Sequence, residues 1–588
     1  MAEHKYIKDY PRPQFVREPW MNLNGDWDFR FDDDGVGERE NWPRELRADR
    51  KITVPFTYET KASGIGDETF HPVVWYQRMI AIPQEYRGKR AILHFQAVDY
   101  QAKVWVNGHY VGMHEGGYAA FSFDITPCLS ESGENRLVVK VTDSPSTVQP
   151  RGKQRWIKDN FGCWYVQTTG IWQTVWMEFV EPDHIRSVKI TPKFDEESVR
   201  FDFVLPDSAA GSGRDLQLVT GVYFEGKRIR ETRMSVERAR FGLELDLRSE
   251  EAGEWKIKPW HPDHPNLYDV KFVLLADGRE ADRVHSYFGM RKISIENGKI
   301  LLNNAPIYQR LLLDQGYWAD THLTPPSEEA ILEDIEHTRR LGFNGVRKHQ
   351  KIEDARYLYW CDRKGLLVWS EMGAAYEFHD EAVDRFTREW LDLVQQFYNH
   401  PCIITWVPFN ESWGIPQVFT DRKQQHFTES IYHLTKALDP YRPVVVNDGW
   451  EHTVSDILTL HDYEEDGDRF LARYSLRDEI LGNRIPFNNG RYAFARGYEY
   501  RGQPVIISEY GGIAFKTDAG WGYGNHVKDE EEFIERYRKI TNAIKATPYV
   551  CGFCYTQITD VQQETNGLLT EGRKPKVDPD KIRAVNLA

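Results

Sequence analysis

The stretch NHPCIITWVPFNESWG, residues 399–414, contains a run of apolar side chains that ends in polar residues. Residues 403–409 are predicted to form a buried strand, with Asn410 and Glu411 at its carboxyl-terminal tip. Strands of a parallel barrel are covered on both faces, so they are apolar along most of their length and polar where they emerge. This stretch therefore predicts a barrel strand that carries a carboxylate at the rim.

A second stretch, QPVIISEYGG at residues 503–512, has the same pattern and ends in Glu509. By chain order the two stretches are the fourth and seventh strands of a barrel, which lie across it from each other. Glycoside hydrolysis needs two carboxyl groups, and a separation of roughly 5–5.5 Å makes the reaction retaining. We therefore predict that Glu411 and Glu509 are the catalytic residues of a glycosidase.

Residues 291–588 alternate strand-like and helix-like runs, which is typical of a (β/α)8 TIM barrel. Helices are predicted over residues 327–341, 354–364 and 384–398, the first with Glu328 and Glu329 in its opening turn, where the helix dipole favours anions. Eight strands are predicted, at residues 307–313, 345–347, 366–370, 403–409, 444–447, 457–460, 505–508 and 552–555.

The first 290 residues contain short alternating runs separated by glycine and proline, which predict β-sandwiches. Residues 1–181 are predicted to form a sandwich or jelly roll, and residues 182–290 an immunoglobulin-like β-sandwich. Asn107-Gly108 between two apolar runs predicts a tight hairpin, because both turn positions require a positive φ.

The chain of 588 residues is too long for one core and has a net charge of −15. An acidic surface repels phosphate groups, which argues against nucleic acid and anionic membranes as partners. No apolar run approaches the roughly 18 residues of a membrane-spanning helix, and no signal peptide is visible at the N-terminus. We therefore expect a cytoplasmic location.

The six cysteines do not form a disulfide framework for a chain of this length. Cys551 and Cys554 match a C-x-x-C pattern, but in a strand they would point to opposite faces. No His/Cys cluster has zinc spacing and no glycine-rich loop has the setting of a phosphate site. We expect no metal and no cofactor, because carboxylates alone perform this chemistry.

These motifs resemble those of glycoside hydrolase family 2, which includes β-galactosidases, β-glucuronidases and β-mannosidases. The resemblance rests on NHP, NES and SEYGG, and extends through VDYQAKVWVNG, TTGIWQTVWMEFV, FNGVRKHQ and GRKPK over nearly the whole chain. It implies the same three-domain layout, with a jelly-roll sugar-binding domain at residues 1–181, an immunoglobulin-like domain and a catalytic TIM barrel. It also implies that Glu411 is the acid/base, Glu509 the nucleophile, and Asn410 the amide that bonds the substrate 2-hydroxyl.

Three stretches depart from the family pattern. Many galactosidases and glucuronidases of the family carry an Arg-Gly-x-Asn-x-His-Glu run after the first strand, where this chain has RLLLDQGYW at residues 310–318. Relatives bring an aspartate from the jelly roll, where this chain has Trp164. Glucuronidases of the family carry Asn-x-Lys ahead of the final Arg-x-Pro-Lys to hold the uronate carboxylate, whereas this chain has Glu564-Thr565-Asn566. An ordinary glucuronidase is therefore not indicated.

Polar and aromatic residues beyond strand ends are candidates for substrate contact or for scaffolding of the rim. The candidates are Asp314, Gln315, Lys348, His349, Gln350, Trp413, Asp448, His461, Tyr463 and Tyr555, with Trp318 and Trp521 as further aromatic residues. Lys348 could supply a cation for a uronate. Arg347 is predicted to be structural, paired with rim carboxylates such as Glu509. By the resemblance, Tyr463 orients Glu509.

Three hypotheses follow. The first is a retaining exo-β-glycosidase, galactosidase-like, that acts on terminal β-linked sugars. The alternative is a β-galacturonidase or β-glucuronidase with a non-standard carboxylate clamp. The third is a catalytically silent carbohydrate-binding protein, against which the two intact glutamates argue. The sequence leaves open the exact sugar and whether the chain forms a homo-oligomer.

Overall fold

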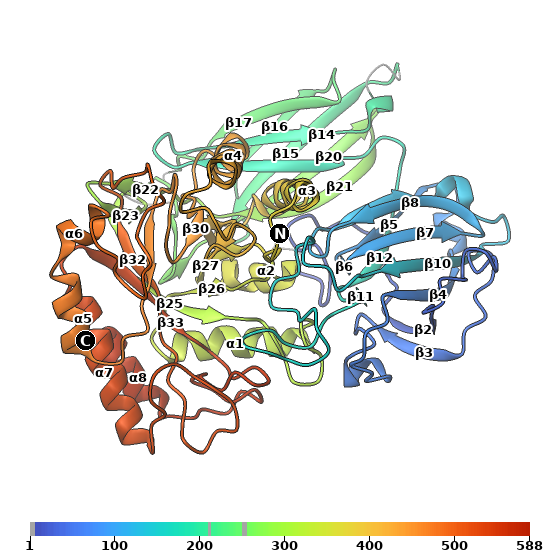
Figure 1. Ribbon diagram of the computed structural model, residues 1–588. Coiled ribbons are helices and arrows are strands. Elements are labelled where there is room, and N and C mark those ends of the chain that lie inside the picture. The colour runs from blue at the N-terminus through green and yellow to red at the C-terminus, as the bar shows by residue number, and fades with distance from the viewer. Residues whose placement is uncertain (1–5, 210–212, 250–255) are drawn as a thin grey trace.

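The computed structural model describes residues 6–209, 213–249 and 256–588. Residues 1–5, 210–212 and 250–255, which fall within the first two predicted domains, lie outside this description. Figure 1 shows a β-sandwich in blue, a second sandwich in cyan and green, and a body of strands and helices in yellow to red. This is the predicted order of jelly roll, immunoglobulin-like sandwich and TIM barrel.

The jelly roll is built from two antiparallel sheets, with strand orders β1-β12-β5-β9 and β3-β2-β4-β10-β7-β8, and a short β11-β6 pair. Alternate residues of its strands point inward, so that Leu137, Val139 and Val141 of β10 are buried with Trp27 and Phe29. Its strands are β1 (Trp20–Asn22), β2 (Gly25–Phe31), β3 (Arg50–Val54), β4 (Val73–Ala81), β5 (Arg90–Phe95), β6 (Val98–Asp99), β7 (Gln101–Val106), β8 (His109–Glu115), β9 (Phe121–Asp124), β10 (Glu134–Thr142), β11 (Gly170–Ile171) and β12 (Val175–Val180), with short helices η1 (Lys61–Ser63), η2 (Gln84–Tyr86) and η3 (Thr126–Cys128).

The hairpin predicted at Asn107-Gly108 is confirmed. Strands β7 and β8 pair antiparallel on either side of the turn, and its two residues have φ angles of 53° and 78°. Positive φ at both positions matches the right-handed twist of the flanking strands.

The second domain packs a β13-β14-β17 sheet against a β16-β15-β20-β21 sheet. Phenylalanines from both sheets meet in its core, with Phe201 and Phe203 against Phe272. Its elements are β13 (Ser187–Lys193), β14 (Ser198–Val204), η4 (Asp207–Ala209), β15 (Leu216–Phe224), β16 (Lys227–Ser235), β17 (Arg240–Asp246), β18 (Trp260–His261), β19 (His264–Pro265), β20 (Tyr268–Ala276) and β21 (Arg279–Phe288).

The N-terminal segment links the first two domains. Val16 pairs with His285 of β21. The buried guanidinium of Arg17 bonds to Asp282 of the same strand and to Glu178 of the jelly roll, at 2.9 and 2.6 Å. The two sandwiches therefore share a buried ion pair.

The barrel is formed by parallel strands in the order β28-β27-β26-β25-β33-β32-β31. The remaining arc is closed by the parallel pair β29-β30, a bridge between Trp406 and Val444, and a hydrogen bond from His461 N to Gly449 O at 3.2 Å. A separate sheet of β22 (Ile293–Glu296), β23 (Lys299–Leu302) and β24 (Ala305–Pro306) precedes the barrel. The barrel strands are β25 (Gln309–Asp314), β26 (Gly345–Lys348), β27 (Leu367–Glu371), β28 (Ile403–Val407), β29 (Phe409–Asn410), β30 (Asn447–Asp448), β31 (Leu458–His461), β32 (Val505–Gly511) and β33 (Val550–Thr556).

Each predicted barrel strand overlaps an observed one. The fourth is split into β28 and β29 at Pro408, which has no N–H to donate to a neighbouring strand. Helix α1 begins after Ser327, whose side chain accepts a hydrogen bond from Ala330 N. Helix α3 begins at Asp380, before the predicted start at residue 384, because Asp380 and Glu381 suit its first turn. The helices are α1 (Glu328–Arg340), α2 (Ala355–Lys364), α3 (Asp380–Phe397), α4 (Arg422–Leu438), α5 (Gly467–Tyr474), α6 (Arg477–Leu481), α7 (Glu530–Ala546) and α8 (Pro579–Leu587).

One hydrophobic core extends from the jelly roll into the barrel. Tyr118, Tyr165 and Trp172 of the jelly roll belong to the same buried cluster as Trp369 and Trp406 of the barrel strands. The jelly roll and the barrel therefore pack against each other through a shared hydrophobic core.

A segment of the jelly roll, residues 150–165, lies on the barrel rim, and we call it the rim loop. Arg151 N and Gly152 N donate to Ala374 O, after β27, at 2.9 and 3.2 Å. Asn160 Nδ2 donates to Gln562 Oε1, after β33, at 2.6 Å. The rim loop thus meets the barrel at the carboxyl ends of its strands, where barrel active sites lie.

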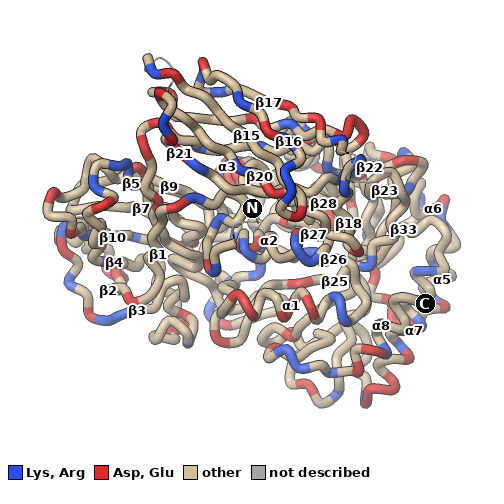
Figure 2. The backbone as a smooth tube through the Cα atoms, turned by 180° about the vertical axis from the view of Figure 1, so that it is seen from behind, with Lys and Arg blue, Asp and Glu red and all other residues tan. Residues whose placement is uncertain are grey.

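Acidic and basic residues are interspersed over all three domains in Figure 2. None of the described helices is long and apolar enough to span a membrane.

Candidate active site

Glu411 and Glu509 meet at the barrel rim. Glu411 follows β29 directly, and Glu509 lies near the end of β32. A carboxylate oxygen of each and Nδ1 of His461 all lie within 4.8 Å of one another. The Glu411 side chain is 19% exposed and the Glu509 side chain 6%. The two carboxylates therefore lie together at the rim but differ in access to solvent. We call Glu411, Glu509 and the residues in contact with them the rim pocket.

Arg347, at the end of β26, lies beneath Glu509 and is fully buried. Its guanidinium donates to Glu509 Oε1 at 2.7 Å, to Asn410 Oδ1 at 2.6 Å and to Glu371 Oε2 at 2.7 Å. Nε also lies 2.9 Å from Asp448 Oδ2. One planar cation thus fixes side chains from four neighbouring strand ends.

His461, at the end of β31, lies between carboxylates. Its Nδ1 is 2.8 Å from Glu411 Oε1 and 3.5 Å from Glu509 Oε2, and its Nε2 is 3.0 Å from Asp448 Oδ2. Burial opposes a charged imidazole, but Glu509, Asp448 and Glu411 raise the pKa of His461 to about 10. His461 is therefore an imidazolium at neutral pH.

Glu509 is held as an anion. Tyr463 OH donates to its Oε2 at 2.5 Å and also lies 3.1 Å from Thr556 Oγ1. Burial alone would raise the pKa of Glu509, but the charges of His461 and Arg347 and the Tyr463 hydrogen bond lower it to about 2. A charged, oriented carboxylate is what a nucleophile requires.

Asn410 Nδ2 and Asp448 Oδ1, beside the two catalytic candidates, are among the buried polar atoms that have no hydrogen-bond partner within the described chain. Arg347 holds the oxygen end of the Asn410 amide and leaves its donor end unused. A buried donor without a partner is costly, so Asn410 Nδ2 is available to a substrate hydroxyl.

His349 lies behind Glu509. Its Nδ1 is 3.0 Å from Arg347 Nη2 and 4.0 Å from Glu509 Oε1. Burial and the charges of Lys153 and Arg347 hold the pKa of His349 well below its ordinary value. The ring is therefore neutral, and Nδ1 can accept from Arg347.

Gln350 and Gln315 are buried in the rim scaffold. Gln350 Nε2 donates to Glu371 Oε1 at 2.9 Å, and its own Oε1 accepts from Ala374 N at 2.7 Å. Gln315 Nε2 donates to Gln557 Oε1 at 2.9 Å. Of the two roles left open for Gln350, substrate contact or scaffolding, the structure favours scaffolding, because both ends of its amide are used within the protein.

Lys348 and Asp314 face away from Glu509, so of the two roles left open for them the structure favours scaffolding over contact with substrate. They are register partners in β26 and β25, and Lys348 Nζ lies 2.7 Å from Asp314 Oδ2 and 2.6 Å from Glu353 Oε2. Nζ also lies 4.3 Å from the ring centre of Tyr357 in α2. Side chains alternate along a strand, so Lys348 faces the helices when Arg347 faces the pocket.

Tyr555 also faces outward, so its expected place around the sugar is corrected. Its ring packs 5.0 Å from that of Tyr537 in α7 and is fully buried. Cys554, the preceding residue, is the one within electrostatic reach of Arg347 and Glu509. Because side chains alternate along a strand, Cys554 faces the barrel interior and Tyr555 faces the helices, so the prediction was wrong by one residue.

Aromatic residues line one wall of the pocket. Trp413 lies 5.6 Å from Trp164 of the rim loop and 5.7 Å from Tyr376, between ring centres. Tyr523 stacks on Tyr463 at 3.4 Å. Of the other two predicted aromatic residues, Trp521 packs edge-on against Tyr523, and Trp318 lies over the Arg573 guanidinium.

Several residues of the site escaped the sequence prediction: Glu371, Lys153, Cys163, Tyr376, Tyr523 and Glu564. Glu371 has a detectable signal, because it ends the apolar run of β27 as Glu411 and Glu509 end theirs. Lys153 and Cys163 have none, because they reach the pocket only when the rim loop packs on the barrel.

Two sets of described residues have metal-like spacing: Glu411, His461 and Glu509, and Asp362, His400 and Cys402. In the first, His461 Nδ1 must lose its proton before it can bind a cation. In the second, Asp362 already accepts hydrogen bonds from Tyr287 OH and Cys402 N at 2.7 and 2.8 Å. Both sets are therefore satisfied by the protein itself.

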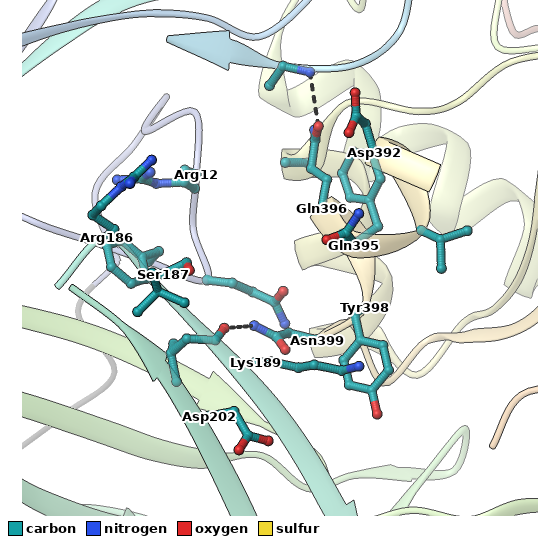
Figure 3. Close-up of a pocket in the computed structure, with 18 of the residues that line it drawn as sticks. Arg12, Arg186, Ser187, Lys189, Asp202, Asp392, Gln395, Gln396, Tyr398 and Asn399 are labelled. Carbon is teal, nitrogen blue, oxygen red and sulfur yellow. Dashed lines mark hydrogen bonds between the residues drawn. The ribbon is translucent and has the colours of Figure 1, made fainter. Parts of the chain in front are cut away.

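A cavity of about 990 Å³ lies elsewhere, where the three domains meet (Figure 3). Arg12 and Arg186 line one side of it, and Asp392, Gln396 and Tyr398 line the other. Neither catalytic candidate is among its lining residues. This interdomain cavity is therefore separate from the rim pocket.

Fold and site together define a three-domain barrel protein with a pair of carboxylates in its rim pocket. Three family models match the chain: the sugar binding domain of glycosyl hydrolases family 2 at residues 20–178, a second model of that family at 183–291, and its TIM barrel domain at 293–585. The chain belongs to glycoside hydrolase family 2.

Relatives carry two kinds of name. A β-galactosidase of Thermoanaerobacter pseudethanolicus is 28% identical over 64% of this chain and 49% of its own length, and a β-glucuronidase of Felis catus is 24% identical over 96% and 90%. This chain spans about half the length of the first three curated relatives that it matches. A β-glucuronidase structure from Ruminococcus gnavus, 18% identical, shares the fold with a TM-score of 0.79 over 97% of both chains.

Proposed function

We propose that this protein is a retaining exo-β-glycosidase that removes terminal β-linked sugars. The observation that carries the proposal is the pair Glu411 and Glu509, whose nearest oxygens lie within 4.8 Å in unlike environments. The β-galactosidase and β-glucuronidase names of the relatives support the same bond type.

In the first step, the Glu509 carboxylate attacks the anomeric carbon and forms a glycosyl ester. Glu411 gives its proton to the glycosidic oxygen as the bond to the leaving group breaks. Glu411 suits this role because its partial exposure allows exchange of protons with the leaving group and with water. Asn410 Nδ2 is available to the 2-hydroxyl, a bond that strengthens as charge develops at the anomeric carbon.

In the second step, Glu411 takes a proton from water, and the oxygen of that water attacks the anomeric carbon as its bond to the Glu509 carboxylate breaks. Glu509 leaves as a carboxylate and regains its bonds to Arg347 and Tyr463. Two displacements at one carbon return the β configuration. The pre-formed cationic and hydroxyl donors stabilise the departing carboxylate without reorganisation.

The proposal is tested with nitrophenyl β-galactoside, β-glucuronide, β-galacturonide and β-mannoside and with nitrophenyl α-L-arabinopyranoside. Glu509→Gln should abolish release of nitrophenol from every substrate that the native protein hydrolyses. Glu411→Ala should slow hydrolysis about 100- to 10,000-fold for poor leaving groups, because the proton donor is lost. The rate of glycosidic bond cleavage should fall much less for 2,4-dinitrophenyl glycosides, because dinitrophenolate leaves without protonation.

Proton NMR of the first sugar released distinguishes the stereochemical course. A β anomer formed first supports the retaining reaction, and an α anomer formed first would contradict it. Unchanged turnover in Glu509→Gln would remove the assignment of the nucleophile.

A further inference from the structure

Lys153, on the rim loop, places a buried ammonium group in the rim pocket. The residue is 5% exposed, and Nζ lies 5.0 Å from the ring centre of Trp413, two residues after Glu411. Across residues 6–209, 213–249 and 256–588, no carboxylate oxygen lies within 4.0 Å of this Nζ. A buried cation without a contacting anion is unfavourable unless a ligand supplies the anion.

The backbone around Lys153 is fixed. The carbonyl of Lys153 accepts from Tyr165 N at 2.8 Å, and the carbonyl of Gly152 accepts from Tyr376 OH at 2.5 Å. Gly152 has a φ of +59°, and a Cβ atom there would lie 2.2 Å from Gln350 O. The ammonium is therefore presented by a rigid support, as a recognition site requires.

The carboxylates nearest to Lys153 are engaged with other groups. Glu564 accepts from Tyr165 OH at 2.5 Å and from Asn566 Nδ2 at 3.1 Å, and Glu509 accepts from Arg347 at 2.7 Å. Glu564 and Glu509 act on Lys153 from a distance, whereas the Cys163 thiol lies within hydrogen-bonding reach of it. Burial alone would lower the pKa of Lys153, but Cys163, Glu564 and Glu509 raise it above the ordinary value. Lys153 is thus a charged donor that no carboxylate contacts directly.

We propose that Lys153 binds the carboxylate of a uronic acid at the non-reducing end of the substrate, which makes this protein selective for β-uronides. The inference rests on the proposed function and names its substrate class. A sugar whose anomeric carbon lies between Glu411 and Glu509 and which stacks near Trp413 presents one ring edge to Lys153. The ammonium and an uronate carboxylate then form a charge-assisted hydrogen bond in a water-poor site.

The rest of the pocket supports this assignment. Lys348, the other candidate cation, is held by Asp314 and Glu353 on the outer side of the strand. The lysine of the Asn-x-Lys pattern is absent from the chain, which has Asn566 without a following lysine. In this protein the cation comes from the jelly roll rather than from the barrel.

The test measures binding of two inhibitors that differ in one group, isofagomine and uronic isofagomine, by calorimetry at pH 7. The native protein should bind the uronic form more tightly. Lys153→Met should reduce that preference about 10- to 100-fold, the range expected for loss of one charged hydrogen bond. Lys153→Arg, which keeps the charge, should retain more of the preference than Lys153→Met. Lys158→Met, an exposed lysine on the same loop, is the matched control and should leave the preference unchanged.

The outcomes separate the two proposals. An equal loss of affinity for both inhibitors in Lys153→Met indicates only a structural role and overturns the inference. Hydrolysis of neutral glycosides by the native protein, with no hydrolysis of a glucuronide or galacturonide, overturns it while the proposed glycosidase stands. Failure of the folded protein to bind either inhibitor or to hydrolyse any substrate of the panel counts against both.

Discussion

Replacement of His461 by glutamine tests whether a charged His461 side chain stabilises the folded protein. His461 is buried and bonds to Glu411 and Asp448. Glutamine has a similar length and can keep one hydrogen bond, but it carries no charge. We expect His461→Gln to be less stable than the native protein at pH 6 and to approach it in stability as the pH rises.

The magnitude follows from the pKa of His461, which is about 10 in the folded protein and roughly 6.5 in an unfolded chain. That difference corresponds to about 5 kcal/mol. A raised pKa in the folded state stabilises fully below the unfolded pKa, and the contribution is lost as pH rises through the folded pKa. The advantage of the native protein should therefore fall from about 5 kcal/mol near pH 6 to about 1 kcal/mol near pH 9.5.

The assay is the difference in thermal unfolding midpoint between native protein and variant, measured from pH 6 to 9.5. A difference of about 10 °C at pH 6, which shrinks with rising pH, is the expected result for a domain of this size. Ionisable groups that titrate alike in the native protein and the variant contribute equally to both midpoints, so their effect cancels in the difference. His433→Gln, on the exposed face of α4, is the control and should show no such trend. A gap that is constant or widens with pH would refute a charged His461.

Two further outcomes are expected. Tyr463→Phe removes the hydroxyl that donates a hydrogen bond to Glu509. The variant should have a kcat about 10- to 100-fold lower in steady-state assays, because a hydrogen bond to a charged group contributes about 1.5–3 kcal/mol. An unchanged kcat would count against the role of Tyr463 in orienting the nucleophile. Lys348→Met removes the cation that pairs with the buried carboxylates of Asp314 and Glu353, and it should lower the free energy of unfolding in urea by about 3–5 kcal/mol. The preference for the uronic over the neutral inhibitor should persist. Loss of that preference with an unchanged urea unfolding midpoint would restore Lys348 as the uronate contact.

Sequence reasoning located the barrel and its catalytic candidates because both depend on local patterns. A parallel strand buried on two faces is an apolar run, and the first charged residue after that run marks the rim, which is how Glu411 and Glu509 stand out. The same rule extends to Glu371, since β27 ends there.

Sequence reasoning failed where one residue of register decides direction. Lys348 and Tyr555 end strands as expected, yet both point toward the helices, because their neighbours Arg347 and Cys554 occupy the inward positions. In a strand that is apolar on both faces, composition does not show which alternate residues face the barrel interior and which face the helices. Lys153 escaped for another reason: its place in the pocket depends on how two domains meet.

The core shared by the jelly roll and the barrel restricts how this protein can be recombined with its relatives. Because Tyr118, Tyr165 and Trp172 are buried in the same cluster as Trp369, a chimera that takes the jelly roll from one relative and the barrel from another must match both apolar surfaces. Such an exchange also carries Lys153 with it, so under the uronate proposal the jelly roll would set the selectivity and the barrel would supply the proposed reaction. New specificity in this architecture would then be acquired by transplanting or redesigning a neighbouring domain, with the catalytic strands left untouched.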